Sequence, residues 1–237
     1  MIKSELIQRS PIRIFEQSIN GGLKPGEMGV ISSPNGVGKT SVLVQIALDK
    51  LLQEKKVIHV SFTQHVHYVP IWYEDIFNEI TGKTSSLENA AEIKNEIVKN
   101  RVTMNFNQDG VTVAQILRSL RAMITEGGFK ADSIIIDGFD FSRVERDSIE
   151  SVKTFAIEMG VCIWYSCSVN DDGKQYDKEN VPVVFSGYAD LLDVVIILQP
   201  KPEPAHVELS VSKDRGSVVS KSMAMRLDPK TLLILGA

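Results

Sequence analysis

The sequence of 237 residues has only two cysteines, Cys162 and Cys167. Both lie in one apolar run, and their odd spacing would send the two side chains to opposite faces of a strand. A disulfide between them is therefore excluded, because the two sulfur atoms would face away from each other. We interpret both as buried, reduced thiols.

Long apolar runs are also missing. No stretch approaches the ~20 consecutive apolar residues that a helix needs to cross a bilayer, and residues 1–6 lack the apolar core of a secretory signal. The sequence has no internal repeat, no low-complexity tract and no linker-like segment. We therefore expect a cytoplasmic protein without membrane association, built as a single domain over residues 1–237.

Strong charge is the third feature that the sequence lacks. Its formal net charge is −4 and its isoelectric point is near 5.6, so nothing attracts the chain as a whole to nucleic acid. A hydrophobic fraction of 43% and a charged fraction of 24% are ordinary for a protein that buries a full core. This composition argues against nucleic acid as a partner.

What the sequence does contain is a phosphate-binding pattern at residues 33–41, Ser-Pro-Asn-Gly-Val-Gly-Lys-Thr-Ser. The pattern requires Gly, four residues, then Gly-Lys-Thr/Ser, and only its first glycine is replaced, by Ser33. Small residues let backbone N–H groups fold around a polyphosphate, while the lysine reaches the terminal phosphates and the hydroxyl ligates Mg²⁺. An apolar strand expected over residues 28–32 and a helix expected over 41–53 provide the flanks that this loop needs.

We therefore predict that this loop binds phosphates, with Lys39 at the terminal phosphates and Thr40 as a Mg²⁺ ligand. The predicted binding residues are Asn35, Gly36, Val37, Gly38, Lys39, Thr40 and Ser41. A Gly-rich turn without a ligand is the alternative interpretation, and the flanking strand and helix disfavour it.

The order of patterns along the chain predicts an α/β fold. Further strands are expected at 57–62, 101–106, 133–137, 161–165, 192–198, 206–212, 222–227 and 231–235. Two helical pieces are expected over 67–100. Another helix is expected after a capping box at Thr112 and Gln115, and a further helix is expected to end at Gly160. Because strands and helices alternate before a run of strands, we predict a mainly parallel central sheet flanked by helices, with a C-terminal antiparallel extension. Residues 67–100 form a helical insertion in this scheme.

Asp137 ends the isoleucine run 134–136, which is typical of a strand that positions a metal. The carboxylate emerges at the carboxyl edge of the sheet, beside the phosphates. We predict that Asp137 holds Mg²⁺ through water. The alternative is an ordinary turn, because Asp137-Gly138 is also good turn chemistry.

The segment 12–27, with Asn-Gly-Gly-Leu-Lys-Pro-Gly-Glu at its end, resembles the corresponding segment of the RecA superfamily, especially its KaiC-like and DnaB-like branches. The resemblance extends through Asp137 to residues 210–216. It implies a RecA-like P-loop NTPase fold, ATP with Mg²⁺ as ligands, and a homo-oligomeric ring or filament such as a hexamer. It also implies that Lys213 and Arg215 are trans-acting catalytic residues, since these families insert a Lys-x-Arg pair into the neighbouring subunit's site. A solvated hairpin end is the alternative for this pair.

The sequence departs from the family where a glutamate should activate the attacking water. Residues 61–65 read Ser-Phe-Thr-Gln-His, and neither Thr63 nor Gln64 is a base at neutral pH. Gln64 could still orient a water as a catalytic residue, as in some GTPases. Asp140 is another acid near the site, and it could replace the base or cap a turn. We therefore expect slow hydrolysis or binding without hydrolysis.

Three other groups of residues carry open alternatives. Ser166 and Ser168 lie where related proteins keep a group that senses the γ-phosphate, and a structural role is equally compatible with them. Segment 169–180 corresponds to a DNA-contacting loop of recombinases and helicases, but its acidic excess should repel phosphates. The aromatic residues of 68–77 form a docking surface, a base-stacking platform or a small satellite core.

The favoured function is an ATP-binding, KaiC-like protein with at most weak Mg²⁺-dependent ATPase activity, whose nucleotide controls self-assembly or the binding of a protein partner. A DNA-dependent ATPase of the DnaB helicase or RecA recombinase type is one alternative. A nonhydrolysing scaffold that kept the fold and lost the ligand is the other.

Overall fold

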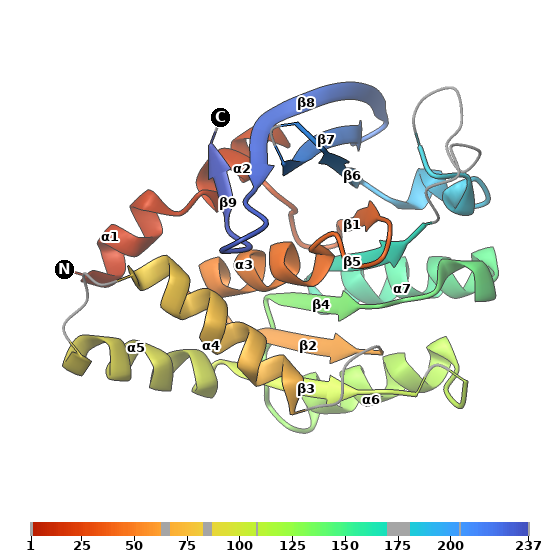
Figure 1. The fold of residues 1–237 in the computed structure, drawn as a ribbon. Coiled ribbons are helices and arrows are strands. Elements are labelled where there is room, and N and C mark those ends of the chain that lie inside the picture. Colours follow the sequence, from red (N-terminus) through yellow and green to blue (C-terminus); the bar gives the residue numbers. More distant parts are fainter. Residues whose placement is uncertain are drawn as a thin grey trace.

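The structure is a computed structural model that describes residues 2–62, 67–82, 87–107, 109–169, 181–203 and 205–236. Within these ranges nine strands form one sheet in the order β3-β2-β4-β5-β1-β6-β7-β8-β9 (Figure 1). The strands are β1 (Met28–Ser33), β2 (Val57–Ser61), β3 (Arg101–Asn105), β4 (Ser133–Asp137), β5 (Cys162–Ser168), β6 (Val194–Lys201), β7 (His206–Asp214), β8 (Ser217–Leu227) and β9 (Ile234–Gly236). The pairs from β3 to β6 are parallel and those from β6 to β9 are antiparallel, which confirms the predicted sheet and its C-terminal extension.

Helices flank the sheet on both faces. They are α1 (Ile2–Arg9), α2 (Ile12–Ser18), α3 (Lys39–Leu52), α4 (Tyr68–Thr81), α5 (Leu87–Lys99), α6 (Val113–Thr125) and α7 (Arg146–Met159), with short 3-10 helices η2 (Phe141–Arg143), η3 (Val183–Phe185) and η4 (Ala189–Leu191). The two helical pieces expected over 67–100 are α4 and α5. None of the helices in the described ranges is both long and apolar enough to cross a membrane.

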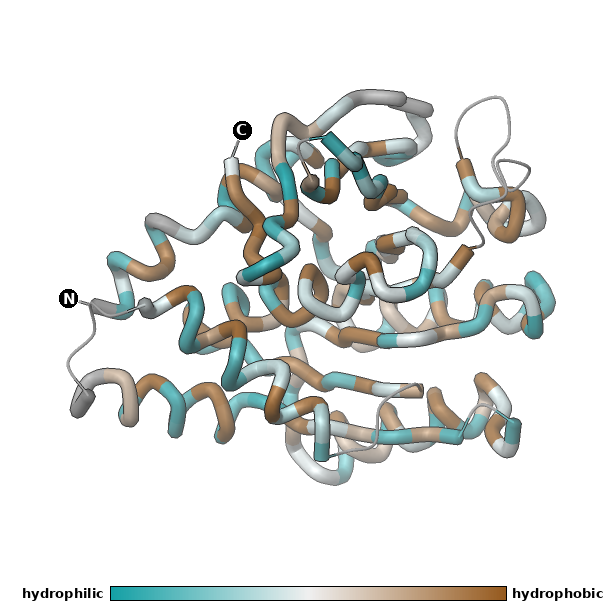
Figure 2. The backbone as a smooth tube through the Cα atoms, in the orientation of Figure 1, coloured by the Kyte–Doolittle hydropathy of each residue, from teal (hydrophilic) through white to brown (hydrophobic). Residues whose placement is uncertain are grey.

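Two cores, one on each face of the sheet, hold these layers together. Helices α3, α4 and α5 pack on one face and α6 and α7 on the other. Cys162 belongs to the first core and Cys167 to the second, so the two thiols do lie on opposite faces of β5. In Figure 2 the outer helix α5 alternates between hydrophilic and hydrophobic residues, because only one of its sides contacts the core.

Local sequence signals place the ends of α6 and α7. The Thr112 hydroxyl accepts a hydrogen bond from the Gln115 amide at 3.3 Å, and the Gln115 side chain accepts one from the Thr112 amide at 2.8 Å. This is the predicted capping box. At the C-terminal end of α7, the predicted stop residue Gly160 has a left-handed φ of 65°, which ends the helix.

A buried histidine lies in the middle of β2. His59 is only 1% exposed, and its Nδ1 lies 3.0 Å from the hydroxyl of Tyr73 on α4. The Arg101 guanidinium lies over the Tyr73 ring at 4.0 Å. Burial, helped by the nearby Arg101 charge, lowers the pKa of His59 to about 3. The imidazole is therefore neutral in the folded protein across the physiological pH range.

Acidification from pH 7 to pH 5 is expected to destabilise the protein by about 2 kcal/mol through His59. In the unfolded chain this imidazole takes up a proton with a pKa of about 6.5, whereas the folded pKa is about 3. The unfolded state therefore binds more protons between these values, and the free energy of unfolding falls as the pH falls. Urea unfolding at pH 5, 6 and 7 will show a weaker pH dependence for His59→Asn than for the wild type. Equal pH dependence in His59→Asn and wild type would contradict this account.

Candidate functional site

The loop between β1 and α3 lies at the carboxyl edge of the parallel sheet. β1 ends at Ser33, and α3 begins at Lys39 with Gly38 as its N-cap residue. Strands β4 and β5 run parallel to β1 in the same sheet, so their last residues, Asp137 and Ser168, reach the same edge. Ligands of open α/β sheets bind outside the carboxyl ends of the strands, which makes this edge the first place to look for a site.

Two glycines give the loop its shape. Gly36 and Gly38 have φ values of 77° and 112°, which side chains rarely adopt. A Cβ atom on Gly38 would lie 2.3 Å from Leu227 Cδ2, at the end of β8, whereas one on Gly36 would meet nothing within 4 Å. Gly38 is therefore favoured by its conformation, and any side chain at this position would also force the buried Leu227 side chain of β8 to shift.

Lys39 is a buried cation whose acceptors are neutral oxygens. Its Nζ donates to the carbonyls of Ser33 at 3.0 Å and Pro34 at 2.7 Å, and to the Ser33 hydroxyl at 3.2 Å. Ser33, which replaces the first glycine of the pattern, thus contributes to holding this ammonium. Burial lowers the pKa of Lys39. Because every hydrogen-bond acceptor of this desolvated ammonium is neutral, a bound anion at the loop would stabilise it.

The predicted metal residues lie in contact although they are far apart in the sequence. The Thr40 hydroxyl donates to Asp137 Oδ2 at 2.9 Å, and the Ser166 hydroxyl donates to Asp137 Oδ1 at 2.5 Å. Asp137 is 2% exposed. Burial raises the pKa of Asp137, while the two hydroxyl hydrogen bonds and the charge of Lys39 oppose that rise.

The oxygens of Thr40 and Asp137 suit Mg²⁺, which prefers oxygen ligands and keeps several waters. Among the described residues no cluster of three or more His, Cys, Asp or Glu side chains could hold a metal by itself. Such a pair of oxygens suits an ion that takes its remaining ligands from phosphates and water, as Mg²⁺ does in nucleotide sites. The residues present therefore fit Mg²⁺ delivered with a polyphosphate, and they do not fit a structural metal.

The C-terminal extension closes against the first turns of α3, which the sequence did not reveal. The Ser41 hydroxyl and the Gln45 side-chain amide both donate to the carbonyl of Leu232, the second at 2.9 Å. The Gln45 side-chain oxygen accepts from the Ile234 amide at 2.8 Å. These contacts span about 190 residues of sequence, so no local pattern could have signalled them.

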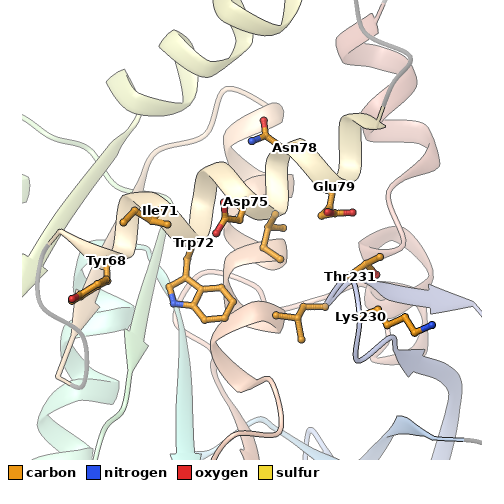
Figure 3. Close-up of a pocket in the computed structure, with 10 residues that line it drawn as sticks. Tyr68, Ile71, Trp72, Asp75, Asn78, Glu79, Lys230 and Thr231 are labelled. Atoms are coloured by element: carbon orange, nitrogen blue, oxygen red, sulfur yellow. The ribbon is translucent and has the colours of Figure 1, made fainter.

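A groove of about 460 Å³ lies between α4 and residues 230–232. Figure 3 shows Trp72 and Glu79 on α4 on the side that faces Lys230 and Thr231. Tyr68 is 56% exposed at the end of this groove, whereas Tyr73 and Phe77 are buried in the core. The aromatic residues of 68–77 are thus divided between a surface platform and a core. Leu232 joins the groove to Ser41 of the phosphate loop.

Lys213 and Arg215 lie at the opposite edge of the sheet from the loop. Asp214 pairs with Val194 at the start of β6, and β6 runs parallel to β1, so this end of β7 is at the amino edge. Neither cation can therefore reach the loop of residues 33–41 in its own chain.

Both cations have partners within the chain. Lys213 is 8% exposed and donates to the carbonyls of Ala189 and Leu192. Arg215 donates to the Glu27 carboxylate and to the Ile19 and Gly22 carbonyls, and so fastens the segment that leads into β1. The interpretation of a solvated hairpin end was wrong for this pair, because both side chains are held by the chain. Their trans-acting role stays a prediction.

The remaining candidate residues either lie outside the described residues or do not join the group formed by Lys39, Thr40 and Asp137. Thr63 and Gln64 lie outside the described residues, as do residues 170–180 of the acidic loop. Asp140 accepts a hydrogen bond from the Ser142 amide at 3.0 Å and pairs with Arg143 at 2.9 Å, so it caps η2. Ser168 is exposed at the end of β5.

No protein-family model matches this sequence, and no curated protein matches it. The function has to be inferred from the residues themselves. The buried Lys39 ammonium, the N-terminus of the 14-residue helix α3 and the oxygens of Thr40 and Asp137 meet at one place. Together these groups offer positive charge to a polyphosphate and oxygen ligands to its counterion.

Proposed function

We propose that this protein binds a nucleoside triphosphate, ATP, together with Mg²⁺ at the loop of residues 35–41. The observation that carries the proposal is the 2.9 Å hydrogen bond between Thr40 and Asp137 beside the buried ammonium of Lys39. A phosphate-loop pattern alone occurs by chance, but an acidic strand end in contact with its hydroxyl residue is the second half of a nucleotide site. A RecA-like, KaiC-like fold is part of the same proposal, supported by the parallel sheet and its antiparallel extension.

Each residue of the loop has a role in this proposal. The backbone N–H groups from Asn35 to Ser41 cradle the phosphates, and Lys39 neutralises the terminal ones. The Thr40 hydroxyl ligates Mg²⁺ and Asp137 holds a water of the ion. Bound Mg²⁺ supplies charge neutralisation for the β- and γ-phosphates.

The groove beside α4 is the candidate binding site for the base of the nucleotide. In a phosphate loop the lysine reaches the terminal phosphates, so the base has to lie away from the lysine. Ser41, two residues after Lys39, binds the Leu232 carbonyl, and Leu232 lines the groove together with Tyr68 and Trp72. The exposed Tyr68 ring and the half-buried Trp72 ring, beside the carboxylates of Asp75 and Glu79, suit a purine, which offers both a stacking face and N–H donors.

Hydrolysis is proposed to be slow or absent. Asp140, the acid that could replace the missing glutamate, instead caps η2 and pairs with Arg143. Nucleotide binding is then better suited to controlling self-assembly or a protein partner than to driving a motor. The contacts of Lys213 and Arg215 within their own chain favour a structural role, so we leave both out of the proposed binding site.

Calorimetric titration of the full chain with ATP, ADP and GTP, each with Mg²⁺ and with EDTA, tests the proposal. We expect binding of ATP and ADP, strengthened by Mg²⁺, and a free energy of unfolding raised by about 2.7 kcal/mol at a ligand concentration 100 times Kd. Absence of both heat and stabilisation would contradict the proposal and favour a scaffold. Phosphate release stimulated by single-stranded DNA would favour the DNA-dependent ATPase instead.

A further inference from the structure

Ser166, on β5 beside the end of β4, forms two hydrogen bonds with neighbouring residues of the site. Its hydroxyl donates to Asp137 Oδ1 at 2.5 Å and accepts from the Gly138 amide at 2.7 Å. The residue is 1% exposed. Because the Gly138 amide can only donate, the single hydroxyl hydrogen of Ser166 is free to point at the carboxylate. The direction of the chain of hydrogen bonds, from Gly138 through Ser166 to Asp137, is therefore fixed.

The Asp137 carboxylate is held from both sides. Ser166 binds Oδ1 and the Thr40 hydroxyl binds Oδ2 at 2.9 Å, so rotation of the carboxylate about its last side-chain bond would break both contacts. The Thr40 hydroxyl hydrogen is used by Asp137, which leaves its oxygen lone pairs for a cation. This arrangement orients oxygens of two elements, α3 and β4, before any ion arrives.

The same geometry argues against contact of Ser166 with a phosphate. A phosphate needs hydrogen-bond donors, and the one donor of Ser166 is already committed to Asp137. A residue that sensed a γ-phosphate would need a donor directed at the loop. Ser166 therefore acts on the carboxylate and only through it on a ligand.

We propose that Ser166 is a positioning residue that orients the Asp137 carboxylate toward the Mg²⁺ bound with the nucleotide. This inference rests on the proposed function, and it concerns the metal and not the phosphates. Hydrogen-bond partners of metal ligands typically contribute 10–100-fold to metal affinity, and because Asp137 holds the ion through water, we expect the lower end of this range for Ser166. Loss of the Ser166 hydroxyl should therefore weaken the binding of Mg²⁺ with ATP and leave ATP binding without Mg²⁺ unchanged.

The test measures ATP binding by calorimetry over a series of Mg²⁺ concentrations and in EDTA. For Ser166→Ala we expect the Mg²⁺ concentration at half-maximal effect to rise about 10-fold, with ATP affinity in EDTA unchanged. Ser151→Ala, which removes an exposed hydroxyl from α7, is the matched control and should follow the wild type. Ser166→Thr keeps the hydroxyl, so its Mg²⁺ concentration at half-maximal effect should lie close to that of the wild type.

The outcomes separate three accounts. An unchanged Mg²⁺ requirement in Ser166→Ala would overturn the inference, and so would an equal loss of ATP affinity with and without Mg²⁺, because that indicates a structural role. If Ser166→Ala does not fold, Ser166→Cys keeps the volume with a weak donor and must show the same selective loss. Failure of the wild type to bind ATP at all would instead refute the proposed function, and the inference with it.

Discussion

Lys39→Met is expected to abolish most of the stabilisation of the protein by ATP and Mg²⁺. The ammonium is the buried cation of the loop, and its acceptors are carbonyls and a hydroxyl that cannot replace it as a partner for phosphate. If the loss of this charge weakens binding 100-fold, the gain in unfolding free energy at 100 times the wild-type Kd falls from about 2.7 to about 0.4 kcal/mol. Urea unfolding with and without ATP and Mg²⁺ measures this difference.

Methionine keeps most of the aliphatic stem of Lys39, so the variant is expected to fold. Lys130→Met removes an exposed lysine far along the chain and serves as the matched control, with the full wild-type gain. A gain in Lys39→Met equal to that of the control would show that the ligand is held elsewhere, for example at the groove alone.

Gly38→Ala is expected to lower the free energy of unfolding by about 2–5 kcal/mol even without a ligand. Two costs add here: a left-handed backbone costs an alanine about 1–2 kcal/mol, and overpacking costs about 1–3 kcal/mol more. The first follows from the φ of 112° and the second from the 2.3 Å approach of the new Cβ to Leu227. Urea unfolding of the unliganded protein measures the sum.

Gly36→Ala separates the two costs. Gly36 also has a left-handed φ, of 77°, but its added Cβ meets nothing within 4 Å. This variant should lose only the backbone term of about 1–2 kcal/mol. Equal losses in the two variants would mean that Leu227 does not pack tightly on the loop.

Sequence patterns predicted the parts of the site that follow from strand order. Thr40 comes from a loop pattern and Asp137 from the end of an apolar strand, and parallel strands bring their carboxyl ends to one edge. Their contact was therefore predictable. The role of Ser166 was not, because it depends on the direction of one hydroxyl hydrogen, which the Gly138 amide fixes.

Other features were missed because their partners are distant or their signal is short. Helix α2 was not predicted, although Ile12, Phe15 and Ile19 lie at helical spacing and are buried. Seven residues are too few for propensity to fix a helix, and packing against the core decides it. The Lys-x-Arg pattern could not reveal that the Ala189 and Ile19 carbonyls accept hydrogen bonds from Lys213 and Arg215.

The bond between Ser41 and the Leu232 carbonyl also has a consequence for biosynthesis. The two residues are 191 positions apart, so Ser41 and its loop are synthesised long before Leu232, whose carbonyl binds the Ser41 hydroxyl. While the ribosome is still translating the C-terminal strands, the nascent chain has a loop without its closing strand, and non-local contacts of this kind form last. If the protein binds the proposed nucleotide, we expect the ligand to stabilise a chain that includes Leu232 more than a nascent chain that lacks it.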